Sequence, residues 1–443
     1  MQAGGKVASP RWWSELRCRG ALRRGEVSYT SRVVVRLQAR TRSRCRFGIA
    51  LAIGVLVAAG SGSASAQTLR SDEAWAELGR GGIHGITVGP IESSQFPGRG
   101  YGTPVSARLL DQLAAMGVNW ISITPFGRLW ALDDTRVLMG FEAPYDSNRE
   151  GVREMVAQAH ARGIRVLLIP HLWVETGGWR GRVDPGSPEG WSAYQHSYSD
   201  FVLAWARDAA EAGADALSVG VEMKSLSYRF GAFWEQLIGD VRAVFPGLLT
   251  YSANWDEVDD VVFWEQLDFI GVNAFYPLAN HPGASDAEYL EGARARVPEL
   301  RELSHELKRP VLFVEVGYTT RRDAAVEPWL WPDDMQHVVI DEGEQARAMS
   351  ALFEAFLPER FFAGFFVWRY YADLDDVSQE AIWGFSPHAK RAERLLTEVF
   401  HARWGVDPEP FPWLHPAPVP PPYPYAGFLP ELFRGPGSSL TIP

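Results

Sequence analysis

The chain has 443 residues, and its hydrophobic content of 46% with 22% charged residues is typical of a globular protein with a sizeable core. The formal net charge is −11 at pH 7. Residues 1–66 hold 12 of the 43 Lys and Arg residues but only 2 of the 54 Asp and Glu residues, so the rest of the chain is strongly acidic. Such a surface argues against nucleic acid and acidic polymers as partners and is compatible with a neutral ligand.

Residues 1–66 are typical of a signal peptide region with a long N-terminal extension. Four arginines in 40–46 precede an apolar run over 47–59, and Ala64–Ala66 fits a cleavage site. The run is too short for a membrane-spanning helix. No lipoprotein cysteine follows it, so we expect no membrane anchor. The pattern predicts Sec-type export to a secreted or periplasmic location, with cleavage near Ala66.

After residue 66 the sequence alternates between two kinds of segment. Short apolar, β-branched runs are typical of buried strands, and we expect eight, over 85–91, 118–126, 164–173, 214–223, 248–255, 267–276, 310–318 and 361–370. Apolar residues at helical spacing predict intervening helices over 106–116, 150–162, 191–211, 231–245, 287–307, 344–356 and 387–400.

This alternation predicts an α/β fold. Buried strands that alternate with amphipathic helices form parallel βαβ units, and eight units predict a (β/α)8 TIM barrel as a single catalytic domain over 67–403. A doubly wound sheet, the competing fold, usually has a glycine-rich phosphate turn after its first strand, and 85–91 lacks one. Residues 404–443 form a Pro-rich tail, expected to lie extended on the barrel or to be disordered.

Polar and aromatic residues gather at the carboxyl ends of the predicted strands, where chemistry takes place in this fold. Glu222 ends the fourth strand and Glu315 the seventh. An ionised carboxylate at the end of a buried strand is costly unless it is paired or in use. The other strand ends carry the residues that we expect to bind substrate: His171, Trp173, Asn254, Trp255, Asn273, Tyr276 and Trp368.

The two glutamates are the candidate catalytic residues. Glycoside hydrolysis requires one carboxyl to protonate the leaving oxygen and one carboxylate to attack or to activate water. The structural alternative for Glu222 is an ion pair with Lys224 or an arginine. For Glu315 it is an ion pair or a helix cap. Two glutamates at matched strand ends favour the catalytic interpretation.

Four segments in order resemble glycoside hydrolase family 113, a β-1,4-mannanase family in clan A, the retaining superfamily with carboxyls on strands four and seven. They are VGVEMKS at 219–225, YSANW at 251–255, DFIGVNAFYPL at 268–278 and FVEVGY at 313–318. The resemblance covers roughly 82–400. It implies that Glu222 is the acid/base and Glu315 the nucleophile of a double displacement. The implied substrate is a β-linked neutral polysaccharide, most directly β-1,4-mannan or manno-oligosaccharides.

One position departs from the wider clan. Many members have an asparagine just before the acid/base to hold the substrate 2-hydroxyl, and Val221 stands there in this chain. The departure favours family 113 over the cellulase-like families. It leaves the 2-hydroxyl contact unassigned, with Asn254 and Asn273 as the candidates.

Three of the expected site residues have a plain structural alternative. Tyr276 either packs in the core or holds the nucleophile with its phenol. Trp368 either forms a stacking floor for a sugar or packs in the core. His171 is either a substrate contact or a hydrogen-bonded core histidine.

Other functions stay open at this point. A glycosidase or transglycosylase on another β-glycan uses the same carboxyl pair, and a non-catalytic carbohydrate-binding barrel keeps the tryptophans. A metal-dependent hydrolase is rejected, because His84 and His171 lack ligand spacing. Both cysteines, Cys18 and Cys45, precede residue 60. We therefore expect no metal or cofactor, and the sequence leaves the oligomeric state open.

Overall fold

The computed structural model describes residues 82–89, 98–140, 143–330, 338–375 and 382–402. The predicted signal region and the Pro-rich tail lie outside the described residues. None of the described helices combines the length and apolar character that spanning a bilayer requires.

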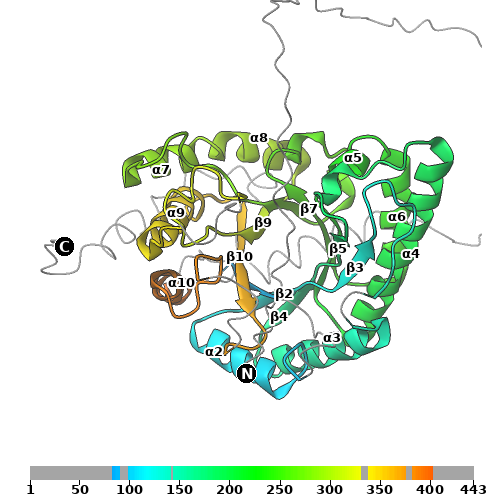
Figure 1. The fold of residues 1–443 in the computed structure, drawn as a ribbon, viewed down its shortest axis with the longest axis horizontal. Helices are drawn as coiled ribbons and strands as arrows, with labels where there is room; N and C mark the ends of the chain where they lie inside the picture. The colour runs from blue at the N-terminus through cyan, green and yellow to red at the C-terminus, as the bar shows by residue number, and fades with distance from the viewer. Residues whose placement is uncertain (1–81, 90–97, 141–142, 331–337, 376–381, 403–443) are drawn as a thin grey trace, which may run out of the picture. The chain divides into compact units, whose positions relative to one another are not determined.

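Eight parallel strands close into a barrel, in the order β1-β10-β9-β8-β7-β6-β4-β2 (Figure 1). This confirms the predicted (β/α)8 fold, because each barrel strand falls within or beside one of the eight predicted runs. The barrel strands are β1 (Ile83–Gly89), β2 (Trp120–Ile123), β4 (Arg165–Leu168), β6 (Ala216–Val221), β7 (Leu248–Asn254), β8 (Ile270–Asn273), β9 (Val311–Val316) and β10 (Phe362–Tyr371).

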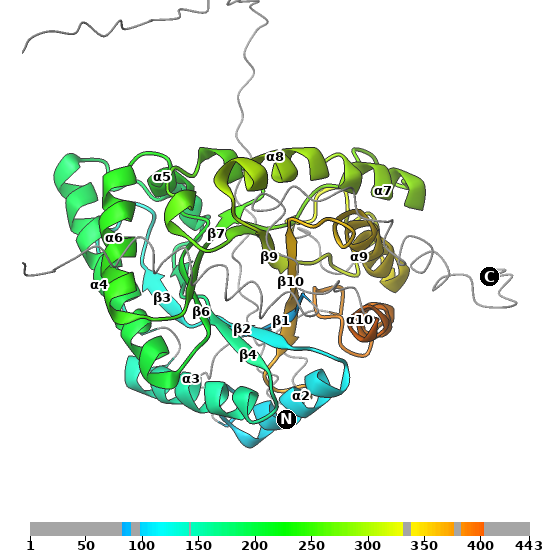
Figure 2. The same ribbon diagram turned by 180° about the vertical axis from the view of Figure 1, so that it is seen from behind.

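Helices surround the barrel, as the view from behind shows (Figure 2). Side chains cap several helix starts: Ser187 accepts from Gly190, and Ser285 forms a capping box with Glu288. The helices are α2 (Pro104–Ala115), α3 (Tyr145–His160), α4 (Pro188–Ala212), α5 (Lys224–Ser227), α6 (Gly231–Val244), α7 (Asp286–Arg294), α8 (Val297–Leu307), α9 (Glu342–Phe356) and α10 (Arg391–His401), with short 3-10 turns η1 (Arg180–Arg182), η2 (Val258–Asp260) and η3 (Trp264–Gln266).

Three of the predicted elements differ from the observed ones, each at a proline. The predicted strands 118–126 and 164–173 are each interrupted, at Pro125 and at Pro170, because proline has no N–H for the ladder. The second halves, β3 (Phe126–Leu129) and β5 (His171–Val174), pair with each other in a separate two-stranded sheet. Likewise the predicted helix 287–307 is two helices, and α8 begins with proline in its first turn.

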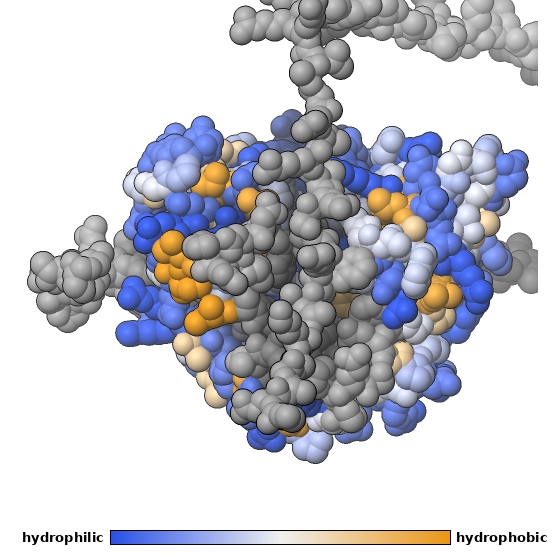
Figure 3. Space-filling view, viewed as in Figure 1, coloured by the Kyte–Doolittle hydropathy of each residue, from blue (hydrophilic) through white to orange (hydrophobic). Residues whose placement is uncertain are grey.

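Two layers of apolar side chains follow from the alternation of strand residues. The barrel interior is a small cluster that includes Phe269, Leu312 and Val314. A larger cluster lies between strands and helices and includes Val272 and Phe313. On the exterior, the part of the face in Figure 3 that grey atoms leave visible is mostly hydrophilic, with small separate hydrophobic patches.

Candidate active site

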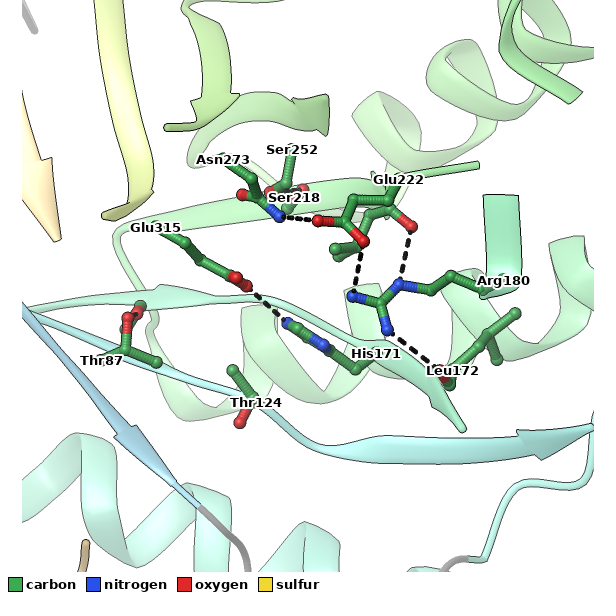
Figure 4. Close-up of polar contacts among 12 residues, drawn as sticks. Thr87, Thr124, His171, Leu172, Arg180, Ser218, Glu222, Ser252, Asn273 and Glu315 are labelled. Atoms are coloured by element: carbon green, nitrogen blue, oxygen red, sulfur yellow. Dashed lines mark hydrogen bonds and ion pairs between the residues drawn. The ribbon is translucent and has the colours of Figure 1, made fainter. Parts of the chain in front are cut away.

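The carboxyl groups of Glu222 and Glu315 point toward the same space from different strands of the barrel (Figure 4). Glu222 directly follows β6, and Glu315 lies on β9, with β7 and β8 between these strands. Both side chains are buried. Burial, and after it the charge of Glu222, raises the pKa of Glu315, so the two groups interact electrostatically.

Irregular backbone directs both glutamates into this space. On β9, Val314 faces the barrel interior, so strict alternation would turn Glu315 outward. The pairing of β9 with β8 shifts register between Val272 and Asn273, a bulge that lets Glu315 face inward as well. Glu222 has a φ of 50°, a left-handed conformation that non-glycine residues adopt rarely and at a cost of roughly 1–3 kcal/mol.

Three donors hold the carboxylate of Glu222. The indole Nε1–H of Trp179 donates to Oε2 at 2.8 Å, and Arg180 Nη2 lies 3.2 Å from the same oxygen. On the other side, Asn273 Nδ2 donates to Oε1 at 2.9 Å. Charge-assisted contacts of this kind fix a carboxylate in one orientation.

Arg180 links the turn η1 to the backbone of β5 and to the end of β6. Its Nε donates to the carbonyl of Val221 at 3.2 Å and its Nη1 to that of Leu172 at 3.4 Å. Sequence reasoning missed Arg180, which lies in η1, nine residues after His171 and away from any strand end. A signal was present in its position beside Trp179, one of several tryptophans on loops at this end of the barrel.

His171 lies beside Glu315, with Nε2 3.1 Å from Oε1. Neither atom has a hydrogen-bond partner among the described residues, and the same holds for Oδ1 of Asn273. Burial, followed by the charges of Arg180 and Arg369, holds the pKa of His171 well below its usual range, so its imidazole is neutral. Buried polar atoms without partners around one space suit a polar ligand.

Trp368 completes this side of the site. Its ring stacks on His171 with centroids 5.9 Å apart and an interplanar angle of 23°. Arg369 lies over the same indole, 4.9 Å from its centroid. The half-buried indole of Trp368 is thus held in place near the end of β10.

The other four residues predicted to bind substrate do not contact the carboxyl pair in the same way. Asn254 ends β7 in register with Asn273, but its Nδ2 donates to Asp256 at 2.8 Å instead of to the carboxyl pair. Trp173 shares a face of β5 with His171 by alternation, and at 36% exposure it lies nearer to solvent.

Tyr276 and Trp255 require a correction. Tyr276 lies in the layer between strands and helices, where its ring packs against Trp255 and Phe313 with Arg296 over it. The prediction that its phenol holds Glu315 is therefore wrong. Alternation explains this, because Tyr276 shares its face with Val272 rather than with Asn273.

Trp255 follows the inward-facing Asn254 and turns outward, so the structure does not bring it to the carboxyl pair. Its ring stacks on Trp329 with centroids 5.6 Å apart, and Arg296 lies 5.7 Å from its centroid. Three of the seven residues predicted to bind substrate lie at the carboxyl pair: His171 lies beside Glu315, Asn273 donates to Glu222, and Trp368 stacks on His171.

The environment of Glu315 predicts a stabilising substitution. Burial, and after it the charge of Glu222, raises the pKa of Glu315 from 4.5 to about 8. A raised pKa in the folded state favours folding below the unfolded value, and this contribution is lost as the pH rises from about 4.5 to about 8. At pH 7 the loss is on the order of 3 kcal/mol. Glu315→Gln should therefore raise the melting temperature at pH 7 by a few degrees, measured by calorimetry.

The same scan at pH 4.5 is the control, because Glu315 is then protonated in the folded state and about half protonated in the unfolded state, so the gain should shrink. A lower melting temperature for Glu315→Gln than for the wild type at pH 7 would contradict the assigned cause. In that case the contacts of the Glu315 carboxyl would stabilise the folded state by more than its burial destabilises it.

The fold agrees with comparisons to known proteins. The chain matches the model of Glycoside Hydrolase Family 113 over residues 96–385. It is similar to the solved family 113 β-mannanase of Alicyclobacillus acidocaldarius, with 28% identity and a TM-score of 0.63 over 72% of this chain and 97% of that one.

Two further structures, described as family 113 β-1,4-mannanases, show the same fold at 23% identity and TM-scores of 0.62. They cover 73% and 72% of this chain and 100% and 99% of their own. No curated protein matches the chain.

Proposed function

Because the chain belongs to glycoside hydrolase family 113, we propose that it hydrolyses β-1,4-mannan or manno-oligosaccharides by a retaining double displacement on Glu222 and Glu315. The observation that carries this proposal is the buried pair of carboxyls that point toward one space at the ends of β6 and β9. A non-catalytic binding barrel has no use for two such costly groups.

In the first step, Glu315 attacks the anomeric carbon while Glu222 gives a proton to the leaving glycosidic oxygen. In the second step, Glu222 takes a proton from water, and the resulting hydroxide displaces Glu315 from the sugar. The pKa of about 8 for Glu315 means that the ligand-free nucleophile is mostly protonated at pH 7. Glu315 must therefore lose this proton before it attacks.

The donors around Glu222 suit its double role. Trp179 and Arg180 hold Oε2, and Asn273 holds Oε1. The carbonyl of Asn273 has no partner among the described residues, so it can accept a bond from the sugar 2-hydroxyl, the contact that Val221 cannot make. Trp368, stacked on His171, provides the platform for the sugar ring.

The identity of the sugar is the part of this proposal that a direct assay settles. The similarity at 28% identity to a β-mannanase supports β-mannan as the substrate. Purified protein should be incubated with mannan, glucan and xylan, and the products should be resolved by length. We expect release of manno-oligosaccharides from mannan, with internal cleavage giving a range of short products. Faster release from glucan or xylan would assign another β-glycan.

We also propose that the chain is exported and cleaved near Ala66, on the strength of the arginine cluster, the apolar run and the small residues that follow. N-terminal sequencing of the secreted or periplasmic protein should begin close to Gln67. Retention of the whole chain in the cytosol would contradict this prediction.

A further inference from the structure

A third buried glutamate, Glu257, lies close to the acid/base but has no place in the reaction just described. It is 1% exposed, in the turn between β7 and η2. Burial raises its pKa to about 8, and the charge of Glu222 raises it as well. A buried carboxyl is costly, so its contacts should show what it contributes.

Hydrogen bonds connect Glu257 to the backbone next to Glu222. The phenol of Tyr251 donates to Glu257 Oε1 at 2.9 Å and accepts the backbone N–H of Met223 at 2.7 Å. Met223 is the residue directly after Glu222. Glu257 Oε1 also accepts the N–H of Asn254 at 3.1 Å, so one oxygen links the ends of β6 and β7.

The Met223 amide, which these hydrogen bonds reach, directly follows the strained backbone of Glu222. Glu222 has a left-handed φ of 50°, and such conformations persist only where the surroundings hold them. On the N-terminal side, the Glu222 N–H donates to the backbone carbonyl of Ser252 at 2.8 Å. On the C-terminal side, the Met223 amide is held by Tyr251, so both peptide groups of the turn are tied to β7.

We propose that Glu257 is a positioning residue that acts through Tyr251 to hold the backbone turn from which Glu222 points into the site. This inference rests on the proposed role of Glu222 as the acid/base. Glu257 does not touch the substrate. Glu257 accepts the Tyr251 O–H and so orients the phenol, whose oxygen lone pair then accepts the Met223 N–H. Loss of the Glu257 or the Tyr251 side chain lets the Glu222 carboxyl move away from the leaving oxygen.

Leaving-group dependence separates this role from a merely structural one. The natural glycosidic bond needs the acid, whereas a dinitrophenyl glycoside of the same sugar leaves without a proton. Tyr251→Phe should lower kcat/KM for the natural glycan about tenfold and lower it much less for the dinitrophenyl substrate. A loss of folded protein would lower both values equally.

Two further variants complete the test. Glu257→Ala should reproduce the selective loss, and Glu257→Gln should recover most of it, because the amide keeps a carbonyl acceptor for Tyr251 and Asn254. Tyr194→Phe is the matched control: it removes another fully buried phenol, whose oxygen has no hydrogen-bond partner among the described residues. It should show no selective loss.

Equal losses on both substrates in Tyr251→Phe, or full activity on the natural glycan, would overturn the inference. Glu222→Ala, measured in parallel, distinguishes this failure from failure of the proposed function. If Glu222→Ala shows the selective loss and Tyr251→Phe does not, only the positioning role is wrong. If Glu222→Ala shows none, Glu222 is not the acid.

Discussion

Glu315→Gln should abolish turnover on every glycoside substrate, with kcat lowered by at least about four orders of magnitude. Gln cannot form the glycosyl ester through which a double displacement proceeds, so the loss applies to good and poor leaving groups alike. The measurement is initial rate on the natural glycan and on a dinitrophenyl glycoside, with the folded state checked by calorimetry. The variant should be at least as stable as the wild type at pH 7, which separates lost chemistry from lost fold.

A matched control is Glu344→Gln. Glu344 is equally buried, but it lies on α9, where it accepts from Tyr289 and pairs with Arg347, remote from the carboxyl pair. The same chemical change at this position should leave activity per folded molecule close to that of the wild type. Full activity in Glu315→Gln would remove Glu315 from the mechanism.

Glu222→Ala should have a different signature, because it removes the proposed acid/base and keeps the proposed nucleophile. On the natural glycan we expect a loss of about 10²–10⁴-fold, the usual contribution of a positioned acid. A dinitrophenyl leaving group needs no proton, so the first step should survive and the glycosyl-enzyme should accumulate. Azide needs no general base, so adding it should restore turnover and yield the β-glycosyl azide.

The outcome that would contradict this role is a loss of the same size on both substrates, with no response to azide. Glu222→Gln serves as the control for cavity effects, since it keeps the volume and still lacks the acid. The loss on the natural glycan should be similar in both variants. A much smaller loss in Glu222→Gln would mean that shape, rather than proton transfer, accounts for the effect.

Sequence patterns were sufficient for the barrel and for the carboxyl pair. The eight apolar runs are each short and bounded by helices, and this rhythm leaves few folds to choose from. The two glutamates were identified because each stands where such a run ends. Family resemblance then supplied their separate roles, which strand-end position alone does not determine.

The directions of the side chains were harder to predict, because one residue of register reverses a side chain. Alternation predicts Tyr276 outward once Asn273 faces inward, and the structure agrees with alternation. For Glu315 alternation fails, since the bulge on β9 turns it inward beside Val314. A bulge depends on pairing with the neighbouring strand, which a single strand's sequence does not reveal.

Arg180 and Glu257 were missed for a related reason. Both lie in short turns beyond the strands. Arg180 contacts Glu222 across 42 residues of sequence, and Glu257 reaches Met223 through Tyr251, which bonds Met223 across 28 residues. No periodic pattern marks such residues, because their role depends on contacts that form only in the folded structure. Prolines 125 and 170 did carry a local signal, since a residue without an N–H cannot continue a central strand.

The central claim is that Glu315 forms a covalent bond to the sugar while Glu222 handles the proton. The most direct test is mass spectrometry of Glu222→Ala mixed with a dinitrophenyl β-mannoside, stopped within the first turnovers and digested to peptides. We predict an added sugar mass on the peptide that contains Glu315, and its loss after azide is added. Release of dinitrophenol with no adduct, or an adduct on another residue, would contradict the account.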